Sequence, residues 1–280
     1  MTVILVAGAA PAAGASTVAV GLAHRAAYAG RRVRLERLAG DARAAADAAV
    51  FAGLEFADST GAPVDAAPAE DPAGVTILEA PAGADASTLA ARLGARLVVV
   101  GAPGTAVPVG ATLVANHAPR TGAGALGEDR LLAAPTVGRL IEASGAQVLS
   151  RSIDGEAAVC EHMVIGAISH DAADSYFNRF PRRAVVARAE KVDLALAAML
   201  TRSECLILTG GHEPSPYILD RAAASRETTL LLAPGGTVET MRDIEGTFGS
   251  SPFSGEAKVE RVGELMRAAL DDAALAALLA

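Results

Sequence analysis

The sequence predicts an α/β protein with two doubly wound domains, and three observations lead to that prediction. Short runs of β-branched and aliphatic residues alternate with alanine- and leucine-rich helical segments along the whole chain. The strand-like runs are apolar throughout, which is typical of parallel strands covered on both faces. With 280 residues, the chain is long enough for one large domain or two ordinary ones.

Nine segments are predicted to be strands, because each is a short run with several aliphatic or β-branched residues. They are residues 3–7, 32–36, 75–79, 97–101, 111–115, 163–167, 183–187, 205–209 and 229–233. The helical segments between them include residues 16–29, 86–93, 192–200 and 216–224. Alternation of this kind favours parallel sheets joined by crossover helices.

Nine strands are many for one sheet, so we expect a boundary between two domains. Segment 117–127 is rich in Gly and Pro and has no periodicity, and a new helix is expected at Thr136. We therefore place the boundary near residue 133. The first domain is predicted over 1–133, and the second, with the C-terminal helices, over 134–280.

Composition and charge exclude several classes of protein. A chain that is 51% hydrophobic and 20% charged has enough apolar surface to fold, which excludes disorder. The net charge of −8 argues against a nucleic acid or an anionic membrane as partner. The apolar stretch 97–115 is interrupted by Pro103 and Pro108, so we expect no membrane span and a cytoplasmic protein. Cys160 and Cys205 are expected to be buried thiols in a reducing compartment.

A loop of small residues joins the first predicted strand to the first predicted helix. It begins at Gly8 and continues through Gly14 and Ala15 to Ser16 and Thr17. In such a loop, backbone N–H groups and the positive end of the helix dipole attract an anion, commonly a phosphate. We predict that these five residues contact a nucleotide, and that Ser16 and Thr17 help to hold Mg²⁺.

The loop lacks one residue of the phosphate-binding motif. The motif places a lysine before the hydroxyl residue, but that position is Ala15, and residues 1–133 contain no lysine. The loss removes a charge-assisted contact of roughly 1.5–3 kcal/mol. It also removes positive charge where a phosphoryl-transfer transition state gathers negative charge. A turn that binds no ligand stays open as an alternative.

The first domain resembles the dethiobiotin-synthetase-like P-loop proteins. Residues 77–83 (Ile-Leu-Glu-Ala-Pro-Ala-Gly) stand where that family has an acidic strand end followed by small residues. The resemblance implies that Glu79 helps to hold Mg²⁺ and that Asp47 is a second metal-linked acid. The alternative for Asp47 is a position on the solvated face of an alanine-rich helix.

Two further positions follow from the same resemblance. Residues 113–119 (Leu-Val-Ala-Asn-His-Ala-Pro) resemble the strand whose Asn contacts the purine edge, which implies that role for Asn116. Arg37 stands roughly where the family has a lysine near the phosphates, or it is a surface charge.

The second domain resembles the DRTGG domain, which follows a dethiobiotin-synthetase-like domain in the N-terminal part of long phosphotransacetylases. The resemblance covers residues 136 to about 268, and the pairing of the two domains extends it over nearly the whole chain. The matching segments are residues 161–168, 176–179, 183–186, 205–216, 243–245 and 258–262.

One DRTGG signature departs from the family, and another is intact. Where many members have Gly-Asp-Arg-x-Asp, residues 189–193 of this chain are Ala-Glu-Lys-Val-Asp. The turn Thr209-Gly210-Gly211 is intact and follows a predicted strand. Open α/β sheets bind ligands at such strand ends, so we expect these three residues in a binding site. A tight strand-to-loop turn is the alternative.

Other kinds of site have little support in the sequence. Cys160, His162, His170, Cys205 and His212 include no two pairs with the spacing of a zinc site. A Gly-x-Ser-x-Gly elbow, which would mark a serine hydrolase, is also absent from the sequence.

These observations predict a regulatory, nucleotide-sensing protein that binds ATP or another nucleotide with Mg²⁺ and has no acetyltransferase activity. Two alternatives stay open. One is an ATP-dependent ligase or ATPase of the dethiobiotin-synthetase type, and the other is an oligomeric scaffold that binds no nucleotide. We also expect a homo-oligomer, most simply a dimer, formed through the second domain. Six of the nine Phe and Tyr residues of the chain follow residue 170, and aromatic residues are enriched at interfaces.

Overall fold

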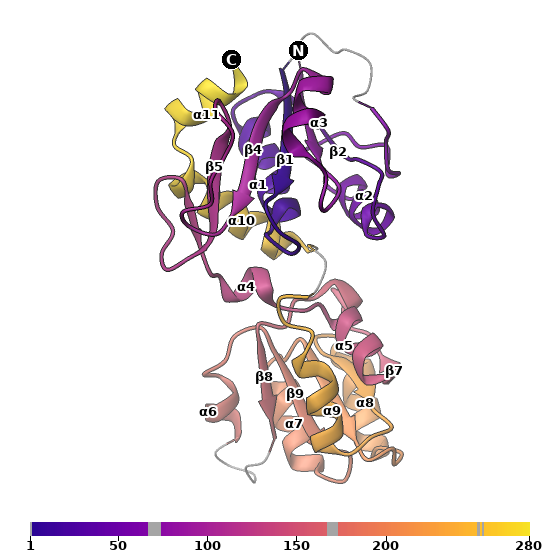
Figure 1. The fold of residues 1–280 in the computed structure, drawn as a ribbon. Helices are drawn as coiled ribbons and strands as arrows, with labels where there is room; N and C mark the ends of the chain where they lie inside the picture. The colour runs from indigo at the N-terminus through magenta and orange to yellow at the C-terminus, as the bar shows by residue number, and fades with distance from the viewer. Residues whose placement is uncertain (1, 67–73, 167–172, 251–252, 254) are drawn as a thin grey trace. The chain divides into compact units, whose positions relative to one another are not determined.

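The computed structural model describes residues 2–66, 74–166, 173–250, 253 and 255–280 (Figure 1). The chain forms two compact units. The first unit contains residues 1–129 together with 258–280, and the second unit contains residues 130–257. The expected boundary at 133 lies close to this division. The C-terminal helices, however, belong to the first unit, whereas the sequence places them with the second domain.

The first unit has a six-stranded sheet in the order β2-β3-β1-β4-β5-β6, and every neighbouring pair is parallel. Strands β1, β3 and β4 are largely apolar at their centres, as expected for strands covered on both faces, whereas β2 alternates charged and apolar residues. Their bounds are β1 (Thr2–Gly8), β2 (Arg32–Arg37), β3 (Gly74–Glu79), β4 (Arg96–Gly101), β5 (Thr112–Ala118) and β6 (Ala125–Gly127).

Five helices surround this sheet: α1 (Ala15–Tyr28), α2 (Ala44–Ala52), α3 (Ala86–Leu93), α10 (Glu256–Ala269) and α11 (Asp272–Leu279). Helix α1 follows β1 after the loop of small residues, and residues 18–26 of the helix are buried. Helix α10 packs closely against it. A Cβ atom on Gly21 of α1 would lie 2.4 Å from Met266 Cγ and 3.0 Å from Val262 Cγ2, so a larger residue at position 21 would separate the helices.

The second unit has a five-stranded sheet in the order β7-β11-β10-β9-β8, in which only β7 is antiparallel to its neighbour. The strands are β7 (Gln147–Ser150), β8 (His162–Ile165), β9 (Arg183–Arg188), β10 (Cys205–Thr209) and β11 (Thr229–Leu232). The helices are α4 (Arg130–Ala133), α5 (Val137–Ser144), α6 (Ala173–Phe177), α7 (Val192–Leu200), α8 (Pro216–Ser225) and α9 (Thr237–Glu245).

Hydrophobic cores lie on both faces of this second sheet. On one face, Phe177 and the apolar residues of α7 and α8 pack against β9 and β10. On the other face, residues of α5 and α9 pack against the same strands. Cys160 and Cys205 belong to this second core and are both buried, with their Sγ atoms 4.0 Å apart.

The predicted fold class is confirmed, since both units are α/β with mainly parallel sheets. All nine predicted strands are present, except that residue 167 lies outside the described residues. Two short strands, β6 and β7, were not predicted, because neither is a long apolar run. No described helix combines the length and apolarity that crossing a bilayer would require.

The aromatic residues of the second unit divide between core and surface. Phe177 is almost fully buried and Phe253 is buried, while Tyr217 is 66% exposed. Tyr176 and Phe180 pack against the core from its margin. Most of these side chains therefore serve the unit's own packing, and the homo-oligomer stays a prediction.

Candidate functional site

The carboxyl ends of β1, β3 and β5 bring together most of the residues predicted for a nucleotide site. Strand β1 lies between β3 and β4. After β1 the chain forms β2 and β3 on one side of it and then crosses to form β4 on the other side, so the strand order reverses beside β1. Open α/β sheets bind ligands outside the carboxyl ends of their strands at such a position. The loop from Gly8 to Thr17 leaves the sheet there, with Glu79 at the end of β3 and Asn116 within β5.

The loop itself is held in one conformation by Asn116. Its Nδ2 donates a hydrogen bond of 2.9 Å to the carbonyl oxygen of Ala13. Gly14 has φ +91°, and a Cβ atom there would lie 2.2 Å from Asn116 Nδ2. Only glycine can therefore occupy position 14 without displacing the amide. The geometry gives Asn116 a role in bracing the loop, in addition to the purine contact that the resemblance implies.

The N-terminus of α1 is open toward the loop. Its N-cap is Gly14, which offers no side chain, and the first turn contains no acidic residue. No side chain among the described residues caps these N–H groups. The first N–H groups of a helix carry partial positive charge and need an acceptor. The end of this 14-residue helix can therefore accept an anion from outside the chain.

Ser16 and Glu79 lie next to each other at this helix end. Ser16 Oγ donates a hydrogen bond of 2.8 Å to Glu79 Oε1. Glu79 is only 4% exposed. Burial raises the pKa of Glu79 to about 7, although Arg37 and the hydrogen bond from Ser16 act in the opposite direction. The carboxyl is thus poised between its neutral and ionised forms near neutral pH.

Arg37, at the end of β2, is the centre of a buried charge cluster. It is 3% exposed and forms ion pairs with Asp41, Asp47 (Nε to Oδ2, 3.4 Å) and Glu79 (Nε to Oε2, 3.7 Å). The same guanidinium donates to the carbonyl oxygens of Leu38 and Glu79. One cation therefore serves three carboxylates, and it is neither a surface charge nor free to bind a phosphate alone.

Asp47 is buried in this cluster, so the solvated helix face considered for it is wrong. The Asp47 carboxylate, which was predicted to lie near Mg²⁺, forms an ion pair with Arg37. Ser16 Oγ and the Glu79 carboxylate are oxygen donors of the kind that Mg²⁺ accepts, and together they fit such an ion. No group of three or more His, Cys, Asp or Glu in the described parts of the chain is arranged to hold a metal by itself.

The Thr209-Gly210-Gly211 turn belongs to the second unit. Thr209 is buried, and its Oγ1 lies 2.9 Å from Thr237 Oγ1 at the start of α9. Gly210 and Gly211 have φ +95° and +66° and follow β10 directly. The N–H of Gly210 donates to the carbonyl of Gly235, so hydrogen bonds within the unit hold this turn. The binding role expected for Thr209, Gly210 and Gly211 stays a prediction.

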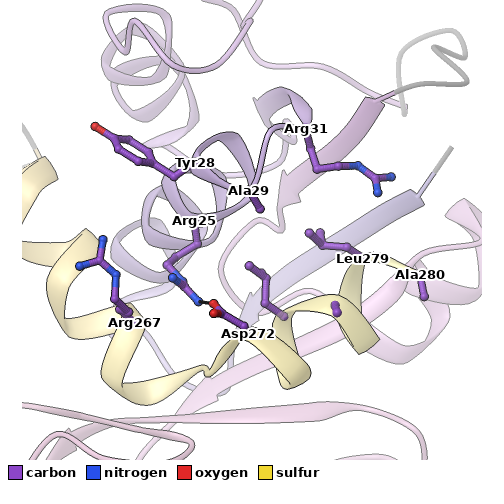
Figure 2. Close-up of a pocket in the computed structure, with 10 residues that line it drawn as sticks. Arg25, Tyr28, Ala29, Arg31, Arg267, Asp272, Leu279 and Ala280 are labelled. Atoms are coloured by element: carbon purple, nitrogen blue, oxygen red, sulfur yellow. Dashed lines mark hydrogen bonds and ion pairs between the residues drawn. The ribbon is translucent and has the colours of Figure 1, made fainter.

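A pocket of about 650 Å³ lies at the opposite end of α1 from the loop (Figure 2). Arg25 enters it from α1 and forms a 2.8 Å ion pair with Asp272 of α11. The same guanidinium donates to the carbonyl oxygen of Leu270, just past the end of α10. Arg25 therefore fastens the C-terminal helices to α1, which accounts for its burial without a ligand.

Sequence analysis missed one member of the charge cluster. Asp41 lies four residues after Arg37 and forms an ion pair with its guanidinium. Its carboxylate also accepts a 2.8 Å hydrogen bond from the N–H of Ala82. Asp41 thus connects the ends of β2 and β3. The i,i+4 spacing was visible in the sequence, but this segment is a loop, where such spacing does not by itself predict a contact.

Comparison with known proteins identifies part of the chain. Residues 139–247 match the family model described as the DRTGG domain. The chain is also similar to a solved structure of the CBS and DRTGG domains from the regulatory region of Clostridium perfringens pyrophosphatase, complexed with its activator diadenosine tetraphosphate. The two share 16% identity with a TM-score of 0.35, over 52% of this chain and 70% of the other. The family match alone places a DRTGG domain over most of the second unit.

Proposed function

We propose that the protein is a regulatory nucleotide sensor, in which the first unit binds ATP or another nucleotide at the Gly8–Thr17 loop. The observation that carries the proposal is the open N-terminus of α1, with the Ser16–Glu79 pair beside it. This arrangement supplies N–H donors for phosphate and oxygen ligands for Mg²⁺. The regulatory role rests on the DRTGG domain and on the resemblance of the two domains to the N-terminal part of phosphotransacetylases.

Binding without efficient hydrolysis follows from the charges near the loop. Position 15 is alanine. Arg37, the nearest basic side chain named by the resemblance, is shared among three carboxylates. Phosphoryl transfer is catalysed mainly by positioning and by stabilising negative charge. A site with this charge balance suits recognition of a nucleotide better than its cleavage, which disfavours the ligase or ATPase alternative.

We therefore expect the purified protein to hydrolyse ATP and GTP no faster than its Ser16→Ala/Thr17→Ala double variant. A phosphate-release assay with and without Mg²⁺ measures this. Turnover on the order of 1 per second that is lost in the double variant would identify an enzyme instead.

Binding itself is tested by differential scanning with ATP, ADP, GTP, acetyl-CoA and cyclic dinucleotides. A ligand present at about 100 times its Kd should add about 2.7 kcal/mol of stability. We expect Asn116→Ala to weaken the binding of ATP and GTP alike by about tenfold, because it releases the Ala13 carbonyl and loosens the loop. Glu79→Gln should remove the dependence of binding on Mg²⁺.

The matched control for both variants is Ser87→Ala, an exposed substitution on α3 of the same unit. It should bind as the unsubstituted protein does. If no nucleotide stabilises the unsubstituted protein, the scaffold alternative replaces this proposal.

A further inference from the structure

Lysine is rare in this chain, and one of its two lysines is fully buried. Lys191 and Lys258 are the only lysines, so the remaining 22 of the 24 basic residues are arginine. Lys191 is exposed, whereas Lys258 on α10 is 0% exposed. Its Nζ has no hydrogen-bond partner among the described residues.

A buried amine without a partner is unfavourable for the folded protein. Taking an ammonium group out of water costs several kcal/mol unless an anion or hydrogen-bond acceptors replace the water. Burial lowers the pKa of Lys258 to about 8. A methionine at this position would fill similar space without that cost, so the amine points to a state of the protein in which it has a partner.

The packing of α10 on α1 locates Lys258 along the loop helix. Gly21 of α1 faces Val262 and Met266, and further along, Arg25 donates to the carbonyl of Leu270. Residue numbers therefore increase in the same direction on both helices at their contact.

Lys258 lies one turn before Val262, on the same face of α10. One turn before Gly21 on α1 is Thr17, the last residue of the loop. This register, extended by one turn on each helix, is the basis for assigning the lysine to the end of α1 that carries the loop. Helical side chains lean toward the N-terminus of their own helix, and this carries the Lys258 amine further toward the loop.

We propose that Lys258 supplies the cation that the loop lacks at Ala15, with its Nζ contacting a phosphate group bound at the N-terminus of α1. The open helix end provides N–H donors but no full positive charge, and Lys258 is the only lysine of the first unit. This inference rests on the proposed nucleotide site and assigns to it a residue that lies about 240 positions away in the sequence.

The first test compares Lys258→Met with Lys191→Met as the matched control. In the absence of nucleotide, Lys258→Met should raise Tm, because it removes an unpaired buried charge. It should also weaken ATP binding by about 10- to 100-fold, the usual effect of losing one charge-assisted hydrogen bond. Lys191→Met should change neither quantity.

The second test uses an acyl-phosphate derivative of ATP, whose acyl carbonyl is attacked by a nearby lysine amine. The acyl–phosphate bond breaks, an amide forms on the lysine, and ATP leaves. Mass spectrometry should find the label on Lys258, not on Lys191, and excess ATP should suppress it.

The outcomes separate this inference from the proposed function. If ATP stabilises the unsubstituted protein and Lys258→Met equally, or if the label lies only on Lys191, the inference is wrong while the nucleotide site stands. If ATP neither stabilises the unsubstituted protein nor competes with the label, both are wrong. If Lys258→Met lowers Tm without nucleotide, the amine is a structural group and the inference is overturned.

Discussion

Replacing Arg37 by methionine should lower the free energy of unfolding by about 3–5 kcal/mol, the usual effect of removing one partner from a buried ion pair. Arg37 forms ion pairs with Asp41, Asp47 and Glu79, and its side chain is 3% exposed. Methionine fills much of the same space, so the loss would come from three carboxylates left near one another without a cation. Chemical denaturation monitored by circular dichroism measures it.

Arg43 provides the matched control, since it approaches the same cluster from solvent. Its Nη2 lies 3.9 Å from Asp47 Oδ1, but its side chain is 61% exposed. Arg43→Met should therefore cost at most about 1 kcal/mol. Arg37→Lys should recover part of the stability, because it restores the positive charge but lacks the planar guanidinium that can donate to several carboxylates at once. Equal losses for Arg37→Met and Arg43→Met would show that the cluster does not depend on its central cation.

Much of the fold was predictable, because the physical signal is local. A strand covered on both faces is mostly apolar along its length, and the predicted apolar runs are strands in the structure. Residues 32–36, which alternate charged and apolar side chains, are a strand as well. Strand β7 was not predicted because only part of it is apolar, and β6 was not predicted because it has only three residues. The order of the strands is not a local property, and neither is the choice of sheet that a helix covers. Helices α10 and α11 follow the second unit in sequence, yet Val262 and Met266 pack on α1.

Several residues of the site could be predicted from the sequence, but the contacts between their side chains could not. Strand ends and the loop placed Ser16, Glu79 and Asn116 at one edge of the sheet, where the structure has them. The pairing of Asp47 with Arg37 was not predicted, because the alanines around Asp47 give α2 no clear polar face. Only the tertiary fold decides which of several small-residue faces turns inward. The same holds for Lys258, whose burial nothing in its own segment indicates.

Glu79→Gln should make the protein more stable than the unsubstituted chain at pH 8 and have much less effect at pH 5. The native carboxyl keeps its proton up to a pKa of about 7, whereas a glutamate in the unfolded chain loses it near 4.5. Between these values the native state binds more protons than the unfolded state, so this residue makes stability fall as pH rises. Glutamine cannot ionise and avoids that loss.

The size of the effect follows from the same shift. Each pKa unit corresponds to about 1.4 kcal/mol, so the stability difference between Glu79→Gln and the unsubstituted protein should grow by about 3 kcal/mol from pH 4.5 to pH 8. Groups far from Glu79 titrate alike in both proteins and cancel from the difference. Glu55→Gln is the control, because it removes one carboxyl from an exposed position of the same unit, and its stability difference is measured at the same pH values.

Mg²⁺ with nucleotide should act on the same equilibrium. A cation bound at Ser16 and Glu79 favours the ionised carboxyl, so it lowers the pKa of Glu79 and removes the loss of stability toward pH 8. Unfolding of the unsubstituted protein, followed by calorimetry at several pH values with ATP alone and with ATP and Mg²⁺, tests this. A pH dependence that Mg²⁺ leaves unchanged would exclude Glu79 as a metal ligand, and its burial would then serve only the packing around Arg37.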